Sequence, residues 1–182
     1  MARSVVLGIG NVLLTDDGAG VHAARRLAER LAAQPFSTQS DIRVLDGGTL
    51  SFTLAPLIAD TERLIILDAM ELGEPAGTVQ CFLGAAVDRL LGRAGLTVHE
   101  VGLRDVLAIA RLADALPRER ALIGVQPACI DWGPEPSERV AAALDRLVDM
   151  TLDLLGTWPT ERVPAGGQTV AVARGLALER PA

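Results

Sequence analysis

The sequence predicts a single-domain α/β protein with three layers, in which a mostly parallel, doubly wound sheet lies between helices. The chain has 182 residues, which suits one domain with a sizeable core. Short runs of β-branched residues alternate with longer segments of helical periodicity, and this alternation favours parallel βαβ units. Because 49% of the residues are hydrophobic and only 3% are aromatic, the core must be built from aliphatic side chains.

The elements follow from local patterns. The first strand is expected at 4–9 (SVVLGI), before the break at Gly10 and Asn11. A helix is expected at about 20–33, capped by Thr15 or Asp16, because its apolar residues recur at helical spacing. The other strands are expected at 42–45, 63–67, 78–83 (an edge strand) and 121–125, and the other helices at 52–58, 103–116 and 134–155. The stretch 84–97 has no clear pattern.

We expect residues 1–156 to form the domain and residues 157–182 to form a tail. The tail contains several Pro and Gly residues and offers no clear partner to the core, so much of it is expected to be mobile. No internal repeat and no second domain are apparent.

Charge and composition exclude some classes of partner. The net charge of −6 argues against nucleic acid or an anionic membrane as the main partner. No secretory signal opens the chain and no apolar run reaches the length of about 18 residues that spans a bilayer. We therefore expect a cytoplasmic protein. Cys81 and Cys129 form no CxxC pair, which argues against a thiolate zinc site, and both are expected to be buried thiols.

Acidic residues follow three of the predicted strands. Asp16 and Asp17 follow the first, Asp46 the second and Asp68 the third. Ligands of open α/β sheets bind outside the carboxyl ends of the strands, so these side chains should converge on one edge. The cost of their mutual repulsion would be offset if they bind a cation or activate a water molecule. His99, in a loop before a helix, adds the nitrogen ligand that a borderline metal favours.

Each of these residues also has a purely structural interpretation. Asp17 could be a helix cap, Asp68 could cap the loop that follows it, and His99 could be a surface or core histidine. The segment from Asp46 to Thr49 (DGGT) has the composition of a turn. His22, inside the first helix, is interpreted as structural. The functional hypothesis depends on the whole set and its shared location.

A nucleotide site is disfavoured although the fold class is similar. Gly8-Ile9-Gly10 begins a GxGxx pattern, but Leu13 stands where a dinucleotide-binding fold needs glycine. The acidic pair Asp16-Asp17 would then lie where a pyrophosphate binds, and no GK[ST] motif follows a strand. We expect no organic cofactor.

Taken together, these segments resemble the hydrogenase maturation proteases, the family of endopeptidases that process the C-terminus of nickel–iron hydrogenase large subunits. The resemblance covers about residues 4–155 in five ordered blocks. They are VLGIGNVLLTDDGAGVHAARRL, DGGT from Asp46 to Thr49, LIILDAM around Asp68, HEVGLRDVL from His99, and IGVQP from Ile123 to Pro127.

The resemblance implies a five-stranded twisted sheet between helices and a metal-contacting trio, which in this chain is Asp17, Asp68 and His99. The family often has Glu at the second acidic position. Asp17 is one methylene shorter, so the metal would lie closer to the main chain or Asp16 would take part. The resemblance also implies a single cut near the C-terminus of the large-subunit precursor after nickel insertion, with nickel supplied by the substrate. These ligands would suit Zn²⁺ or Mn²⁺ as well.

The mechanistic hypothesis is metal-assisted hydrolysis. Asp17, Asp68 and His99 hold the metal of the precursor, Asp17 or Asp68 activates water, and the backbone of Asp46, Gly47, Gly48 and Thr49 grips the substrate. One alternative is a metal-independent pair of aspartates, Asp17 and Asp68, that share a proton. Another is a chaperone or binding module that inspects the nickel site without cutting.

Overall fold

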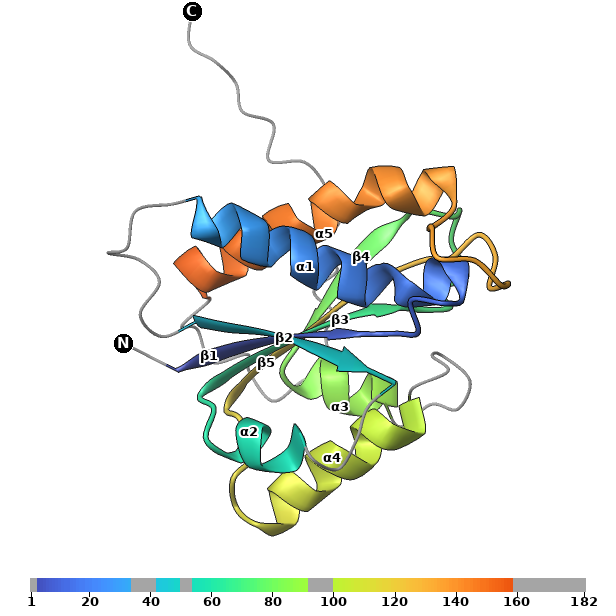
Figure 1. The fold of residues 1–182 in the computed structure, drawn as a ribbon. Helices are drawn as coiled ribbons and strands as arrows, with labels where there is room; N and C mark the ends of the chain where they lie inside the picture. The colour runs from blue at the N-terminus through green and yellow to red at the C-terminus, as the bar shows by residue number, and fades with distance from the viewer. Residues whose placement is uncertain (1–2, 34–41, 50–53, 92–99, 159–182) are drawn as a thin grey trace, which may run out of the picture.

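The computed structural model describes residues 3–33, 42–49, 54–91 and 100–158, and it confirms the predicted three-layer α/β fold (Figure 1). Within these residues five strands form one sheet in the order β2-β1-β3-β5-β4. Their bounds are β1 Ser4–Ile9, β2 Ile42–Gly48, β3 Arg63–Ala69, β4 Val79–Leu83 and β5 Glu119–Val125. All neighbours are parallel except β4, which runs antiparallel to β5. Its position at the edge of a mostly parallel sheet is the one that the sequence predicts.

Helices cover both faces of the sheet. Figure 1 shows α1 and α5 on one face and α2, α3 and α4 on the other. The helices are α1 Ala19–Ala32, α2 Ala55–Ala59, α3 Ala85–Leu91, α4 Glu100–Leu112 and α5 Glu138–Thr157, and a 3₁₀ turn, η1 Thr15–Gly18, precedes α1. Among the residues described, no helix is both long enough and apolar enough to cross a membrane.

The core is aliphatic and divides between the two faces. β1 and β3 are central strands whose side chains are buried on both sides, as expected of parallel strands covered by helices. Ile65 and Leu67 of β3 pack with α1 and α5, whereas Leu64 and Ile66 pack on the side of α4. Because side chains alternate along a strand, Asp68 lies on the same face as Leu64 and Ile66.

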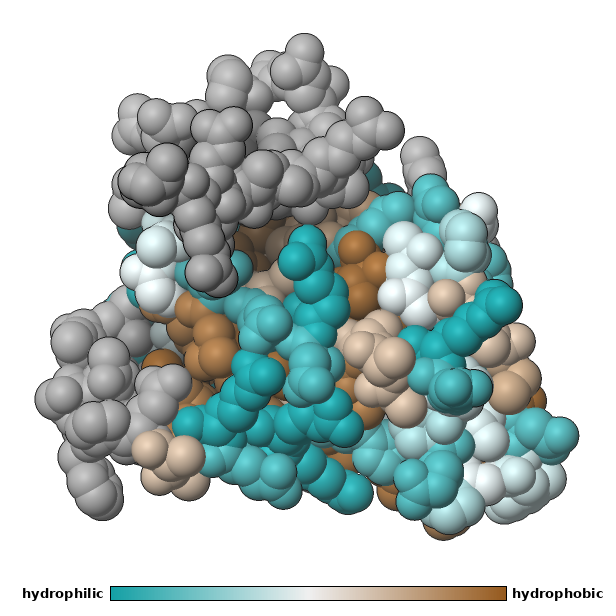
Figure 2. Space-filling model, turned by 90° about the horizontal axis from the view of Figure 1, so that it is seen from above, coloured by the Kyte–Doolittle hydropathy of each residue, from teal (hydrophilic) through white to brown (hydrophobic). Residues whose placement is uncertain are grey.

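The outer face of the α1–α5 layer is polar. Figure 2 looks onto this face and shows hydrophilic side chains gathered across its middle. Arg26 and Arg30 of α1 form ion pairs with Asp145 of α5, and Arg30 also pairs with Asp149. These contacts link the two helices above the core, but exposed ion pairs of this kind contribute little, about 0–1 kcal/mol each. Burial of the apolar helix faces holds the layer in place.

Several boundaries differ from the predictions. The stretch 84–97 contains the short helix α3, which was missed because seven residues are too few for a clear period. α4 ends at Leu112, before the expected end at 116, and α5 begins at Glu138 because Ser137 is its N-cap. The expectation for residues 157–182 falls, after Trp158, outside the described residues.

Candidate active site at the carboxyl edge of the sheet

Asp17 and Asp68 lie at the same edge of the sheet. β1 and β3 are parallel neighbours, so their carboxyl ends lie side by side. Asp17 belongs to η1, which follows β1 and contacts β3, and Asp68 belongs to β3 itself. Both side chains are almost fully buried, with 2% of Asp17 and 0% of Asp68 exposed. The sequence placed Asp68 just past its strand, whereas the strand extends to Ala69.

Glycines bring the start of α1 down onto the strand ends. A Cβ atom on Gly20 would lie 2.1 Å from the carbonyl oxygen of Leu67 and 2.4 Å from that of Ile9. Gly10 has φ +135° and a Cβ there would lie 1.8 Å from the carbonyl oxygen of Asp17. Only glycine permits these approaches. They place η1 and the first turn of α1 against the segment of β3 that carries Asp68.

The side chain of Asp17 is oriented by a backbone hydrogen bond. The N–H of Asn11 donates to Asp17 Oδ2 over 2.8 Å, and Asn11 Oδ1 in turn accepts from the N–H of Leu13 over 3.0 Å. Asp17 is not the N-cap of α1, because Gly18 occupies that position and no side chain caps the helix. The expectation that Thr15 or Asp16 caps this helix is wrong for the same reason.

Asp16 is a structural residue that holds distant segments together. It is fully buried, and its carboxylate accepts four hydrogen bonds. Oδ2 accepts from Ala128 N over 2.7 Å, from Cys129 N over 3.1 Å and from Ser137 Oγ over 2.9 Å, while Oδ1 accepts from Ser137 N over 2.6 Å. We call these contacts the Asp16 network. They bind η1 to the loop that follows β5 and to the start of α5.

His99, the third residue of the predicted trio, lies outside the described residues. α4 begins at the next residue, Glu100. Within the described ranges, no group of three or more His, Cys, Asp or Glu side chains could hold a metal ion. Asp17 and Asp68 lie at the same edge and carry carboxylate oxygens, the kind of donor that a divalent cation accepts, and a metal there needs further ligands.

Asp46, Gly47 and Gly48 belong to the edge strand β2 and not to a turn, in contrast to the prediction that the strand ends at residue 45. Asp46 is exposed. Its Oδ2 pairs with Arg25 of α1 over 2.9 Å, and its Oδ1 accepts from the N–H of Gly48 over 3.0 Å. The carbonyl of Gly48 accepts from the N–H of Gly10 over 2.8 Å. This segment, with exposed Thr49 after it, therefore borders the loop between β1 and η1.

The loop between β5 and α5 is the part of this edge that sequence reasoning missed. Thr15 N donates to the carbonyl of Gly133 over 2.7 Å, and Gly133 N donates to the carbonyl of Leu13 over 3.0 Å. Thr15 Oγ1 also donates to the carbonyl of Cys129 and accepts from the N–H of Asp131. The available signal was the position of this Pro- and Gly-containing loop after a strand whose carboxyl end meets the same edge.

His22 and the two cysteines differ in how far they are buried. The ring of His22 is half-buried and interacts with the carbonyl of Pro134, consistent with its structural interpretation. Burial, followed by the charge of Arg25, lowers the pKa of His22. Cys81 is buried, and burial raises its pKa to about 11. Cys129 is exposed, so the expectation of two buried thiols is wrong for this residue.

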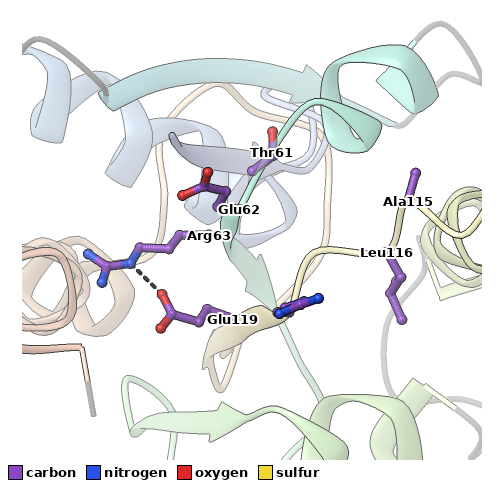
Figure 3. A pocket seen from close by; sticks show the side chains of 7 residues that line it. Thr61, Glu62, Arg63, Ala115, Leu116 and Glu119 are labelled. Carbon is purple, nitrogen blue, oxygen red and sulfur yellow. Dashed lines mark hydrogen bonds and ion pairs between the residues drawn. The ribbon is translucent and has the colours of Figure 1, made fainter. Parts of the chain in front are cut away.

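A pocket of about 480 Å³ lies at the opposite edge of the sheet (Figure 3). Arg63 and Glu119, which begin β3 and β5, form an ion pair there. The pocket is lined by Thr61, Glu62, Arg63, Ala115, Leu116, Arg118 and Glu119. Because Asp17 and Asp68 lie at the carboxyl ends of the strands, this pocket is not part of the candidate site.

Comparisons with known proteins identify the family. The family model described as hydrogenase maturation protease matches residues 21–154. The hydrogenase expression/formation protein HupM of Azotobacter chroococcum mcd 1 is 35% identical over 185 residues, covering 98% of this chain and 86% of the relative. The hydrogenase 2 maturation protease of Escherichia coli K12 is 30% identical over 163 residues, covering 89% and 96%.

The fold agrees with a solved member of the same group. The hydrogenase maturating endopeptidase HybD from E. coli superposes with a TM-score of 0.77 at 28% identity, over 86% of this chain and 94% of that structure. Sequence and fold thus lead to the same group of proteases, and the resemblance carried by the five sequence blocks is confirmed. The chain belongs to the hydrogenase maturation protease family.

Proposed function

We propose that this endopeptidase removes the C-terminal extension of a nickel–iron hydrogenase large-subunit precursor after nickel insertion, and that Asp17, Asp68 and His99 act on the nickel-bearing segment. The observation that carries the proposal is the burial of two carboxylates at adjacent strand ends in a member of this protease family. Carboxylates at this edge can bind a cation of the substrate and can accept a proton from water.

The acidic residues and His99 have different roles in the proposal. The carboxylate of Asp17 is held by the N–H of Asn11, and the backbone of Asp68 is fixed in the ladder of β3, so both residues have defined positions at the edge. Nickel on the precursor would anchor the peptide and polarise the scissile carbonyl. Asp17 or Asp68 accepts the proton of the attacking water, and His99 supplies the nitrogen ligand. Asp16 is not part of this set in the proposal, because its carboxylate accepts four hydrogen bonds in the Asp16 network.

The segment Asp46, Gly47, Gly48 and Thr49 is proposed to contact the substrate peptide. It ends an edge strand, beside the β1–η1 loop, and a strand edge can pair with an extended peptide through its backbone. Asp46→Asn tests this contact. The exposed pair with Arg25 contributes little to folding, so a rise in KM without a change in the free energy of unfolding supports the contact. An unchanged KM excludes a contribution from the Asp46 carboxylate. Thr49→Pro tests the backbone contact, because proline removes the N–H just after β2, and an unchanged KM in that variant contradicts the contact.

The cytoplasm is the proposed location of the reaction. Both cysteines of the chain are free thiols, and free thiols fit a reducing compartment.

The decisive experiment mixes the protein with nickel-loaded and nickel-free precursor and measures the intact mass of the large subunit. We expect a loss of the C-terminal peptide from the loaded precursor only. Cleavage of both forms would favour the metal-independent pair of aspartates, and an unchanged mass in the presence of binding would favour a chaperone.

Variants assign the residues in the same assay. Asp17→Asn, Asp68→Asn and His99→Ala should each abolish processing while circular dichroism reports a folded protein. Asp60→Asn is the matched control, because Asp60 is an exposed aspartate just before β3, at the opposite edge. Full activity of the His99→Ala variant would exclude the trio.

A further inference from the structure

Three large apolar side chains are exposed in two loops of the carboxyl edge that backbone hydrogen bonds join. The exposed fractions are 58% for Leu13, 46% for Ile130 and 81% for Trp132. Leu13 lies in the β1–η1 loop, and Ile130 and Trp132 lie in the loop between β5 and α5. Exposed apolar groups that gather on one surface indicate a binding site more often than scattered ones do. We call these three residues the rim platform.

Hydrogen bonds hold the two loops of the rim platform together. Gly133 pairs with Leu13 and Thr15 through its backbone, and Thr15 Oγ1 connects to Cys129 and Asp131 on either side of Ile130. The N–H of Trp132 donates to Asp131 Oδ1 over 2.7 Å. Because these backbones are already ordered, a partner that binds here loses little free energy to loop ordering.

The rim platform is continuous with the candidate active site. Leu13 is four residues from Asp17, and its N–H donates to Asn11, whose own N–H orients the Asp17 carboxylate. Asp17 and Asp68 are buried below this rim. A protein substrate whose scissile peptide reaches the two carboxylates must therefore pass close to the platform.

The charges beside the platform specify the partner further. Asp131 and Glu135 are exposed, and in the part of the chain described by the structure neither forms an ion pair. The whole chain carries a net charge of −6. Apolar groups flanked by carboxylates complement a segment that has apolar side chains next to Lys or Arg.

We propose that the rim platform is the docking surface for the large-subunit precursor, and that it binds an apolar segment of the precursor flanked by basic residues. The inference rests on the proposed function, since that function supplies the partner. It adds that recognition depends on Leu13, Ile130 and Trp132 as well as on the nickel-bearing segment.

Steady-state processing of the nickel-loaded precursor tests the platform. Trp132→Ser and Ile130→Ser should each raise KM about tenfold and leave kcat within twofold. Leu112→Ser is the matched control, because Leu112 is 89% exposed at the far end of α4, and it should leave both constants unchanged. Glu135→Gln should weaken the dependence of KM on salt. If wild type cuts the precursor and Trp132→Ser has an unchanged KM, the platform is excluded and the proposed function stands.

Binding gives a second test that does not require cleavage. The chain has two tryptophans, so labelling with 5-fluorotryptophan gives separate ¹⁹F signals for Trp132 and Trp158. Unlabelled precursor should shift the Trp132 signal and leave that of Trp158, which lies at the end of α5, unchanged. Bound precursor with an unchanged Trp132 signal would overturn the inference. A Trp132 signal that changes with protease concentration alone would assign the surface to a second copy of this chain and would also overturn it.

Discussion

Ser137 donates both its backbone N–H and its hydroxyl to the buried carboxylate of Asp16, over 2.6 and 2.9 Å. Ser137 is also the N-cap of α5, where its Oγ accepts from the N–H of Val140. The two adjacent acidic residues of the sequence therefore have different environments. Asp16 fixes the framework of the edge, and Asp17 is held by the neighbouring turn at Asn11.

Substitutions of the two aspartates should therefore change different properties: that of Asp16 lowers the stability, and that of Asp17 lowers the processing rate. Asp16→Ala removes the buried carboxylate that accepts from Ala128, Cys129 and Ser137, so the free energy of unfolding should fall by about 3 kcal/mol. Asp17→Asn should change it by less than about 1 kcal/mol and lower the processing rate at least about 100-fold. Urea denaturation and the mass assay measure the two quantities. Equal losses of stability in both variants would contradict this division.

The close contact of α1 with the strand ends predicts a strong effect at Gly20. Gly20→Ala must displace the carbonyls of both Leu67 and Ile9, and overpacking of this kind costs about 1–3 kcal/mol. Gly156→Ala is the control, because it lies within α5 and has no atom within 4 Å of its would-be Cβ. It should stabilise the protein by up to about 1 kcal/mol. Thermal unfolding compares the two, and a neutral Gly20→Ala would refute the tight contact.

His22 should make the protein less stable in mild acid. Burial and the charge of Arg25 lower its pKa in the folded state, so between that pKa and about 6.5 the unfolded chain binds more protons. The stability due to neutral His22 is fully present above about pH 6.5 and is lost as the pH falls. Urea denaturation of wild type and His22→Gln at about pH 7.5 and 5.5 measures this, and the variant should lose less stability. An equal loss in both proteins would exclude a contribution from His22.

The two thiols should differ in reactivity. Burial raises the pKa of Cys81 to about 11, so this thiol stays protonated and covered at neutral pH, whereas Cys129 is exposed. A thiol reagent should modify one cysteine in the native protein and both after denaturation. Cys129→Ser should remove the native reaction, and Cys81→Ser should leave it intact. A fast reaction at Cys81 in the folded state would require an opening of the sheet near β4.

The sequence predicted most of the fold because its main strands and helices have simple periods. β1 and β3 are uninterrupted apolar runs, and the apolar positions of α1 and α5 recur at helical spacing. Lengths of elements were harder to predict, because tertiary pairing decides them. Asp46 and Asp68 are poor strand formers, yet both continue their strands, because Asp46 pairs with Gly8 of β1 and Asp68 pairs with Gly124 of β5.

The location of the acidic residues was predicted from strand ends alone, but their individual tasks were not. Nothing local distinguishes Asp16 from Asp17, since the partners of Asp16 lie more than 110 residues further along the chain. The exposure of Ile130 and Trp132 was unpredictable for a related reason. It depends on how their loop pairs with Leu13 and Thr15, and that pairing arises only in the folded chain.

The distance in sequence between Asp16 and its partners also affects the order of events during synthesis. At typical rates of elongation, η1 emerges from the ribosome about 10 seconds before residues 128–137 do. During that interval the Asp16 carboxylate lacks the donors that hold it in the finished fold. In a nascent chain this edge of the sheet is therefore completed only after residues 128–137 have emerged, when most of the chain has been made.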